Sequence, residues 1–189
     1  MADEEREMSW TVRGERTIYD SRWVRLALAD VEAPTGERWE HHVVHLGRVA
    51  VALVVNERDE ALMLWRYRFA TDQWGYELLG GIIDGDEDAA ETAAREAEEE
   101  SGWRPIGGAE HLLSFEPVPG MVTAGVDVFL WQRAERVGEP SDAEEAGRIE
   151  WVPLSRMVEL AARGELLGAG TLVAVLYYLA SRFGPARGS

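Results

Sequence analysis

The sequence contains no cysteine, so it carries neither a disulfide framework nor a cysteine-based zinc site. It is also poor in positive charge: 19 lysine and arginine residues stand against 35 aspartate and glutamate residues, which gives a formal net charge of −16. A nucleic-acid backbone is bound by a positive surface, so we expect no nucleic-acid partner. Small phosphorylated substrates are compatible with this charge, because bound cations neutralise a pocket locally.

Long apolar segments are missing as well. The most apolar stretch, residues 171–180 (TLVAVLYYLA), is well short of the roughly 20 residues that a membrane-spanning helix needs. We therefore predict a core helix there and no membrane partner. The opening residues, MADEEREM, lack the basic and apolar regions of a signal peptide, and the expected location is cytoplasmic.

A helix with an acidic face is the strongest local pattern. Residues 88–100 contain neither glycine nor proline and are rich in alanine, glutamate and arginine, while Gly102 is a stop signal. At about 100° per residue, Glu96, Glu99 and Glu100 lie within roughly 100° of arc. Three carboxylates therefore share one face of the predicted helix, beside alanines that are small enough to pack closely on a sheet.

Carboxylates at this spacing repel one another and destabilise a helix unless a cation lies among them. Oxygen ligands suit Mg²⁺ or Mn²⁺, and such ions are typically held by a few carboxylates together with substrate phosphates. The pattern thus indicates a metal site and a phosphate-containing substrate. Taken alone, an EAEEE run is also typical of a solvated helix face, and the residues around it decide between the two interpretations.

Residues 81–103 resemble the signature of the Nudix hydrolases, Gly-x5-Glu-x7-Arg-Glu-U-x-Glu-Glu-x-Gly-U, in which U is a bulky aliphatic residue. Ala97 and Trp103 depart from the pattern at the two U positions but remain apolar. A motif with this many fixed positions in one short window is specific. All the fixed positions are matched: Gly81, Glu87, Arg95, Glu96, Glu99, Glu100 and Gly102.

The resemblance implies an α/β fold, the Nudix α/β/α sandwich with a mixed sheet, over residues 44–183. Residues 1–43 then form a small antiparallel β extension, and residues 184–189 form a C-terminal tail. The sequence also predicts a helix at residues 155–163, with Ser155 as its N-cap. Apolar and alternating patterns predict strands at residues 10–12, 17–20, 24–31, 38–45, 49–56, 61–67, 111–115, 126–133 and 149–152.

Three segments resemble the ADP-ribose pyrophosphatase branch of the family, together with the N-terminal strands: residues 66–68 (RYR), 76–78 (YEL) and 115–120 (FEPVPG). In that branch the N-terminal unit commonly exchanges between two subunits, so the resemblance implies a homodimer. The sequence departs from the branch at two places. Residues 79–80 are Leu-Gly, where Pro-Ala is usual before the motif glycine. Residues 123–124 are Thr-Ala, at the place where an acidic residue often follows the Pro-Gly loop.

The family motif also implies which residues hold the metal. By match to the motif, Glu96 and Glu100 are the principal ligands of Mg²⁺ (or Mn²⁺), and Glu99 shares a second ion. The backbone carbonyl of Gly80 is expected to complete the shell.

Other motif positions are expected to be structural. Arg95 is expected to pair with Glu87 and to orient the carboxylates, because bidentate geometry suits an arginine and a carboxylate; contact with substrate is the alternative. Gly81 and Gly102 complete this structural set.

A general base must take the proton of the attacking water. In the resembling pyrophosphatases a loop glutamate shortly before a late strand does so, and alignment on residues 149–151 gives this role to Glu145. Two alternatives stay open. Glu145 and its neighbours Asp142 and Glu144 are solvated loop charges, or Glu99 supplies the base from the motif helix.

Arg68 matches a family arginine that approaches the nucleotide, and Glu77 lies just before the motif turn, so both are candidates for substrate binding. Alternatively, either residue is a salt-bridge partner at the surface.

The resemblance implies hydrolysis of the diphosphate linkage of a nucleoside diphosphate derivative, with ADP-ribose, cleaved to AMP and ribose 5-phosphate, as the preferred substrate. A dinucleotide or a nucleoside triphosphate is the alternative within the enzyme class. A non-catalytic ligand sensor with the same fold usually lacks a motif carboxylate, and none is missing here. An acidic helix that merely binds a structural cation is the remaining interpretation.

Overall fold

The computed structural model describes residue 5, residues 7–141 and residues 147–183. The chain divides into two compact units. One consists of Met1–Gly47 with Glu116–Gly125, and the other of Arg48–Phe115 with Val126–Ser189. The segment Glu116–Gly125 thus belongs with the N-terminal unit, although it interrupts the sequence of the second unit.

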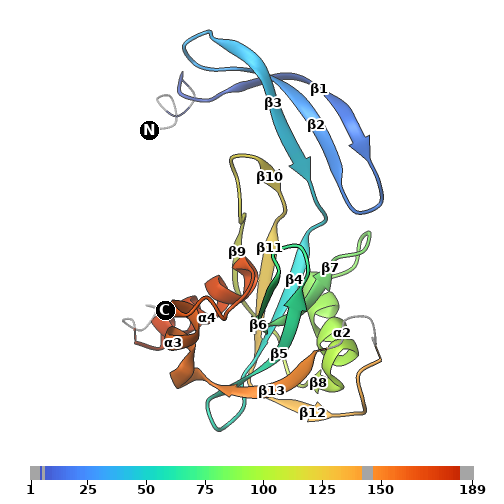
Figure 1. Ribbon diagram of the computed structural model, residues 1–189, viewed down its shortest axis with the longest axis vertical. Coiled ribbons are helices and arrows are strands. Elements are labelled where there is room, and N and C mark those ends of the chain that lie inside the picture. The colour runs from blue at the N-terminus through green and yellow to red at the C-terminus, as the bar shows by residue number, and fades with distance from the viewer. Residues whose placement is uncertain (1–4, 6, 142–146, 184–189) are drawn as a thin grey trace. The chain divides into compact units, whose positions relative to one another are not determined.

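The N-terminal unit contains a four-stranded sheet with the strand order β1-β2-β3-β10 (Figure 1). Its first three strands are antiparallel, and β10 lies parallel to β3. The strands predicted at residues 10–12 and 17–20 are present, but their separation into two strands is wrong. They form one strand, in which register shifts between Val12 and Gly14 and between Thr17 and Tyr19 absorb the irregular residues. The bounds are β1 (Thr11–Asp20), β2 (Arg25–Glu32), β3 (Arg38–His45) and β10 (Val122–Thr123).

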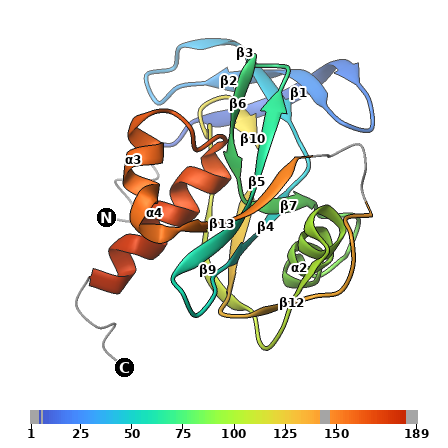
Figure 2. The ribbon, with the colours of Figure 1, turned by 60° about the horizontal axis from the view of Figure 1, so that its bottom comes forward.

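The second unit is built on two sheets, with the strand orders β7-β4-β11-β9 and β13-β5-β6, and a short ribbon pairs β8 with β12 (Figures 1 and 2). β4 and β11 are parallel, whereas β7 and β9 run antiparallel to them, so this sheet is mixed, as predicted. The bounds are β4 (Val49–Val54), β5 (Glu60–Arg68), β6 (Gln73–Glu77), β7 (Leu79–Ile82), β8 (Trp103–Pro105), β9 (Glu110–Phe115), β11 (Val126–Trp131), β12 (Ala134–Arg136) and β13 (Arg148–Pro153).

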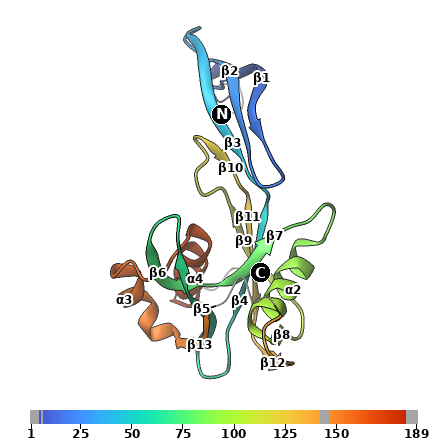
Figure 3. The same cartoon turned by 45° about the vertical axis from the view of Figure 1, so that its right-hand side comes forward.

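Helices cover the strands of this unit from both sides, with α2 on one side and α3 and α4 on the other (Figures 1 and 3). The alternation of side chains along β4 explains the two layers. Ala50 and Ala52 belong to the core cluster that contains the alanines of α2, whereas Val51 and Leu53 belong to the cluster that contains residues of α3 and α4. The predicted α/β/α arrangement is confirmed. The helices are α2 (Ala89–Ser101), α3 (Met157–Ala162) and α4 (Ala169–Phe183).

The helix predicted to begin with Ser155 as its N-cap begins later. Ser155 lies inside a short 3-10 helix, η1 (Leu154–Arg156), α3 follows at Met157, and no side chain caps either helix. The N–H of Leu154 donates to the carbonyl of Asp59 at 2.8 Å and its side chain is buried, which favours a tight turn before the α-helix. In the part of the chain that the structure describes, no helix has the length and apolarity needed to cross a bilayer.

Candidate active site

Local signals fix both ends of the motif helix α2. At the N-terminus the Asp88 side chain accepts hydrogen bonds from the amides of Ala90 and Glu91, at 2.9 and 3.2 Å. At the C-terminus Gly102 is left-handed, with φ 70°, and its N–H donates to the carbonyl of Glu98. A Cβ at Gly102 would lie only 2.3 Å from the carbonyl oxygen of Gly138, so glycine is required there for two reasons.

Small residues bring the acidic face of α2 close to β7. Ala93 and Ala97, two residues of α2, are fully buried. A Cβ at Gly81 would lie 2.5–2.7 Å from the carboxylate atoms of Glu96. The absence of a side chain at Gly81 therefore leaves the space that the Glu96 carboxylate occupies against the strand.

The guanidinium of Arg95 contacts three carboxylates. It donates to both oxygens of Glu87 at 3.1 Å, to Glu96 Oε1 at 2.7 Å and to Glu99 Oε2 at 2.9 Å. These bonds, the one to Glu87 above all, raise the pKa of Arg95, and Arg95 in turn holds the pKa of Glu87 below its ordinary value. The structure thus contains the expected bidentate pair of Arg95 with Glu87, and the same arginine relieves the repulsion between Glu96 and Glu99.

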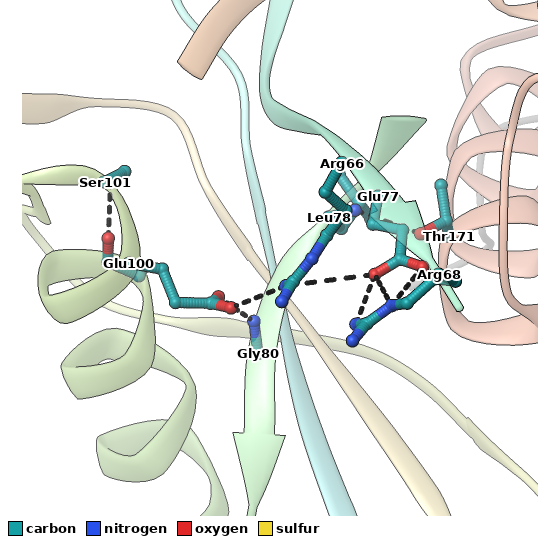
Figure 4. Close-up of polar contacts among 9 residues, drawn as sticks. Arg66, Arg68, Glu77, Leu78, Gly80, Glu100, Ser101 and Thr171 are labelled. Carbon is teal, nitrogen blue, oxygen red and sulfur yellow. Dashed lines mark hydrogen bonds and ion pairs between the residues drawn. The ribbon is translucent and has the colours of Figure 1, made fainter. Parts of the chain in front are cut away.

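Glu100 faces inward and is held from two strands (Figure 4). It is 5% exposed; its Oε2 accepts a hydrogen bond from the N–H of Gly80 at 2.9 Å, and its Oε1 accepts one from Arg66 Nη1 at 3.1 Å. Beside Gly80, the N–H of Leu78 donates to Thr171 Oγ1 at 3.0 Å, which ties the junction of β6 and β7 to α4. The junction of β6 and β7 is therefore held from both helix layers, by Glu100 of α2 and Thr171 of α4.

The two candidates for substrate binding contact each other. Arg68 donates from Nε to Glu77 Oε1 at 2.9 Å and from Nη2 to Glu77 Oε2 at 2.5 Å, so the salt bridge that the sequence left open is present. Glu77 is nearly buried, whereas the Arg68 side chain is 46% exposed. Arg66, to which sequence reasoning gave no role, lies within 4.0 Å of the same Glu77 carboxylate. The sequence did contain a signal that could have identified Arg66, because it is a charged residue that directly follows the apolar run of β5.

The structure brings Gly80 and Gly81 of β7 together with Glu96 and Glu100 of α2, and Arg95 connects Glu99 to them. Glu145, with Asp142 and Glu144, lies outside the described residues. The described end of that loop lies beside Arg66, since a Cβ at Gly147 would be 3.3 Å from the Arg66 Cβ.

The fit of a divalent cation can be judged from the donor groups. Within residues 5, 7–141 and 147–183, no group of three or more histidine, aspartate or glutamate side chains is arranged to hold a metal ion, and the motif carboxylates are bonded to Arg95 and Arg66 instead. The donors are nevertheless carboxylate oxygens from one helix face beside the two glycines of β7, and oxygen ligands of this kind suit Mg²⁺ or Mn²⁺. The residues thus fit such an ion chemically, provided that the bonds of Arg95 rearrange.

Two hollows in the second unit contain none of the motif carboxylates. One, of about 470 Å³, is lined by Trp65, Trp74, Gly147 and Arg148. Trp74 is 58% exposed, so it is not a core residue and offers a ring face to solvent. The other hollow, of about 490 Å³, includes the edge-to-face ring pair of Trp103 and Trp151 in its wall.

Known proteins resemble this chain over most of its length. The NUDIX domain family model matches residues 45–169. A CMP-5'-(N-acetyl-N-hydroxy-3-aminopropyl)phosphonate hydrolase of Streptomyces rubellomurinus (strain ATCC 31215) is 44% identical over 172 residues, which is 91% of this chain and 83% of the relative. The ADP-ribose pyrophosphatase of Bacillus subtilis (strain 168) is 28% identical over 163 residues, covering 85% and 87% of the two chains.

A methanol dehydrogenase activator of Bacillus methanolicus is 27% identical over 170 residues, covering 88% of this chain and 90% of the relative. The crystal structure of an ADP compounds hydrolase superposes with a TM-score of 0.77 at 20% identity, covering 93% of this chain and 96% of that one. At this identity the structural likeness supports the fold alone.

Proposed function

Since this chain belongs to the Nudix family and is a hydrolase of nucleotide derivatives, we propose that its substrate is a nucleoside 5′-monophosphate joined through an anhydride to a second phosphorus group. The observation that carries this proposal is the complete set of motif carboxylates, gathered beside Gly80 and Gly81 of β7, with Gly81 leaving room for Glu96. A sensor that had lost catalysis would not need to keep all of them.

Two substrates of this class have support. The segments shared with the ADP-ribose pyrophosphatase branch favour ADP-ribose, which with one water gives AMP and ribose 5-phosphate. The 44% identity to the Streptomyces enzyme favours a cytidylyl phosphonate, which with one water gives CMP and a free phosphonate. Both reactions break one P–O–P bridge, and the greater identity makes the cytidylyl phosphonate the better first candidate.

The proposed roles follow from the site. Glu96, Glu99, Glu100 and the carbonyl of Gly80 would hold Mg²⁺ (or Mn²⁺), and such an ion, when bound, supplies Lewis-acid stabilisation of charge on the phosphoryl oxygens. Arg95 keeps the carboxylates ordered through Glu87.

Arg68, held in place by Glu77 and half exposed, is positioned to meet an anionic substrate. Its guanidinium can form paired hydrogen bonds with phosphate oxygens.

For the proton of the attacking water, we propose Glu145 as the general base, with Glu99 as the alternative. Glu145→Gln removes the basic oxygen while keeping the shape of the side chain, and general-base catalysis is typically worth about 10²–10⁴-fold in rate. We expect kcat to fall by that order while KM changes little. Near-normal turnover of this variant would eliminate Glu145, and a loss seen only with Glu99→Gln would move the base to the motif helix.

We also propose that the active form is a homodimer. Every residue of β1 is exposed, and the N-terminal unit presents large apolar side chains to solvent, which is typical of a surface that another chain covers. These side chains include Trp10, Val12, Ile18, Tyr19 and Trp23. Light scattering coupled to gel filtration should give twice the chain mass of 21.1 kDa, and a monomer at micromolar concentration would contradict this.

A substrate panel tests the function as a whole. The purified protein is incubated with Mg²⁺ and ADP-ribose, a cytidylyl phosphonate, a dinucleotide or a nucleoside triphosphate, and products are followed by ³¹P NMR, with chelator and a Glu96→Gln/Glu100→Gln double variant as controls. We expect release of a nucleoside monophosphate that both controls abolish. Triphosphates with the highest kcat/KM would refute both preferred substrates, ADP-ribose and the cytidylyl phosphonate, and ligand binding without turnover would indicate a sensor.

A further inference from the structure

Arg66 is a cation in the most buried part of the sheet. It follows Leu62, Met63 and Leu64 on β5, all fully buried, and is itself 6% exposed. An isolated charge in such surroundings is strongly unfavourable, so its carboxylate partners matter. Two are Glu100, at 3.1 Å on the motif helix, and Glu77, at 4.0 Å on β6.

Both carboxylate oxygens of Glu100 accept hydrogen bonds, one of them from this arginine. The Glu100 side chain is 3% exposed, against 8% for that of Arg66, and the two carboxylate oxygens are held by donors from two different strands. The N–H of Gly80 on β7 bonds one oxygen, and Arg66 on β5 bonds the other. Because both oxygens are held, rotation of the carboxylate group is restricted.

The contacts continue beyond Glu100 as a chain of alternating charge. Figure 4 shows Glu100, Arg66, Glu77 and Arg68 one after another in space, each in contact with the next; they belong to α2, β5 and β6. Glu100 is the buried end of this chain, and Arg68 is the exposed end. Arg66 lies in the middle and contacts both carboxylates.

We propose that Arg66 is a positioning residue for the reaction: it holds Glu100 in the orientation that binds a divalent cation, and it couples Glu100 through Glu77 to the substrate-facing Arg68. This inference rests on the proposed function. Arg66 acts through Glu100 and Glu77 and touches neither the ion nor the substrate. Residues that orient metal ligands in this way typically change metal affinity or activity by about 10–100-fold when they are replaced.

The test compares Arg66→Met, which removes the charge, with Arg66→Lys, which keeps a charge but not the planar fork. Arg104→Met is the matched control, because Arg104 also pairs with a glutamate of α2, Glu98, but on the exposed side. Mg²⁺ binding is measured by calorimetry without substrate, and the Mg²⁺ dependence of kcat and KM is measured on the best substrate of the panel.

We expect Arg66→Met to weaken Mg²⁺ binding by about 10–100-fold and to raise the Mg²⁺ concentration for half-maximal rate by a similar factor. Arg66→Lys should recover part of the loss, and Arg104→Met should match wild type. Wild-type Mg²⁺ affinity in Arg66→Met, with only a lower Tm, would show a structural ion pair and overturn the inference. Should that variant not fold, wild-type affinity in Arg66→Lys would overturn it equally.

The same titrations separate this inference from the proposed function. Absence of Mg²⁺ binding by the wild-type protein would overturn both. Tight binding by wild type that Arg66→Met leaves unchanged would overturn the inference alone and leave the hydrolase proposal intact.

Discussion

The substitution Gly81→Ala tests whether the Glu96 carboxylate has a functional position. The added methyl carbon would lie 2.5 Å from Glu96 Cδ and 2.6 and 2.7 Å from its two oxygens. Ordinary contacts begin near 3.4 Å, so the carboxylate must retreat by nearly 1 Å. Since it is the end of a flexible side chain, it can move without displacing the strand or the helix.

This geometry predicts a large effect on rate and a small one on stability. Replacing glycine by alanine stiffens the unfolded chain, which contributes about 0.4–1 kcal/mol in favour of folding and offsets part of the cost of moving Glu96. We therefore expect the free energy of unfolding to change by less than about 1 kcal/mol. A misplacement of about 1 Å in an active site can lower the rate about 10²-fold, and we expect a loss of this order in kcat.

The assay pairs urea denaturation with steady-state hydrolysis at saturating Mg²⁺, and two other glycines serve as controls. Gly108→Ala adds a methyl group with nothing within 4 Å and should preserve both stability and rate. Gly102→Ala places alanine at φ 70° and 2.3 Å from a backbone oxygen, and should lose at least about 1–2 kcal/mol of stability. Full activity in a well-folded Gly81→Ala protein would refute a functional position for Glu96.

Three further substitutions test the local structure around the motif. Glu87→Gln removes a carboxylate whose pKa is held below its ordinary 4.5, mainly by Arg95, so this stabilisation is present above pH 4.5 and is lost as the pH falls through the lowered folded pKa. Thermal melts should show a Tm difference from wild type at pH 7 that closes in acid, and a difference independent of pH would count against the pair. Asp88→Ala removes the acceptor for two helix amides and should lower the free energy of unfolding, measured by urea denaturation, by about 1 kcal/mol. An unchanged urea midpoint would show that Asp88 does not cap the helix. Ala97→Leu enlarges a fully buried side chain and should cost about 1–3 kcal/mol by overpacking; wild-type stability would mean that α2 does not pack closely.

What could be predicted from the sequence was mainly local. The helix expected at residues 88–100 occupies Ala89–Ser101, because its cap, its stop and its alanine stripe all lie within a few residues of it. The strands β4, β5 and β11 follow from apolar runs, and their alternating faces produce the two helix layers. The carboxylates of the motif share a helix face because their spacing alone decides it.

What could not be predicted depends on pairing between distant strands. The partner of Glu100 on β5, Arg66, is separated from it by 34 residues, and only the register of the folded sheet brings the two together. Likewise, β10 pairs with β3 although Arg48–Phe115, about half of the second unit, lies between them in sequence. The prediction of Ser155 as an N-cap is wrong because the start of that helix depends on tertiary contacts rather than on a local signal. Leu154 is buried, and its N–H donates to the carbonyl of Asp59.

The most direct test is a crystal structure with Mg²⁺ and an uncleavable analogue of the nucleotide substrate. The account predicts a cation about 2.0–2.1 Å from oxygens of Glu96 and Glu100, with phosphoryl oxygens of the analogue in the same coordination shell. Bound analogue with no cation at these carboxylates, and Glu96 and Glu100 still bonded only to Arg95, Arg66 and the Gly80 amide, would contradict it.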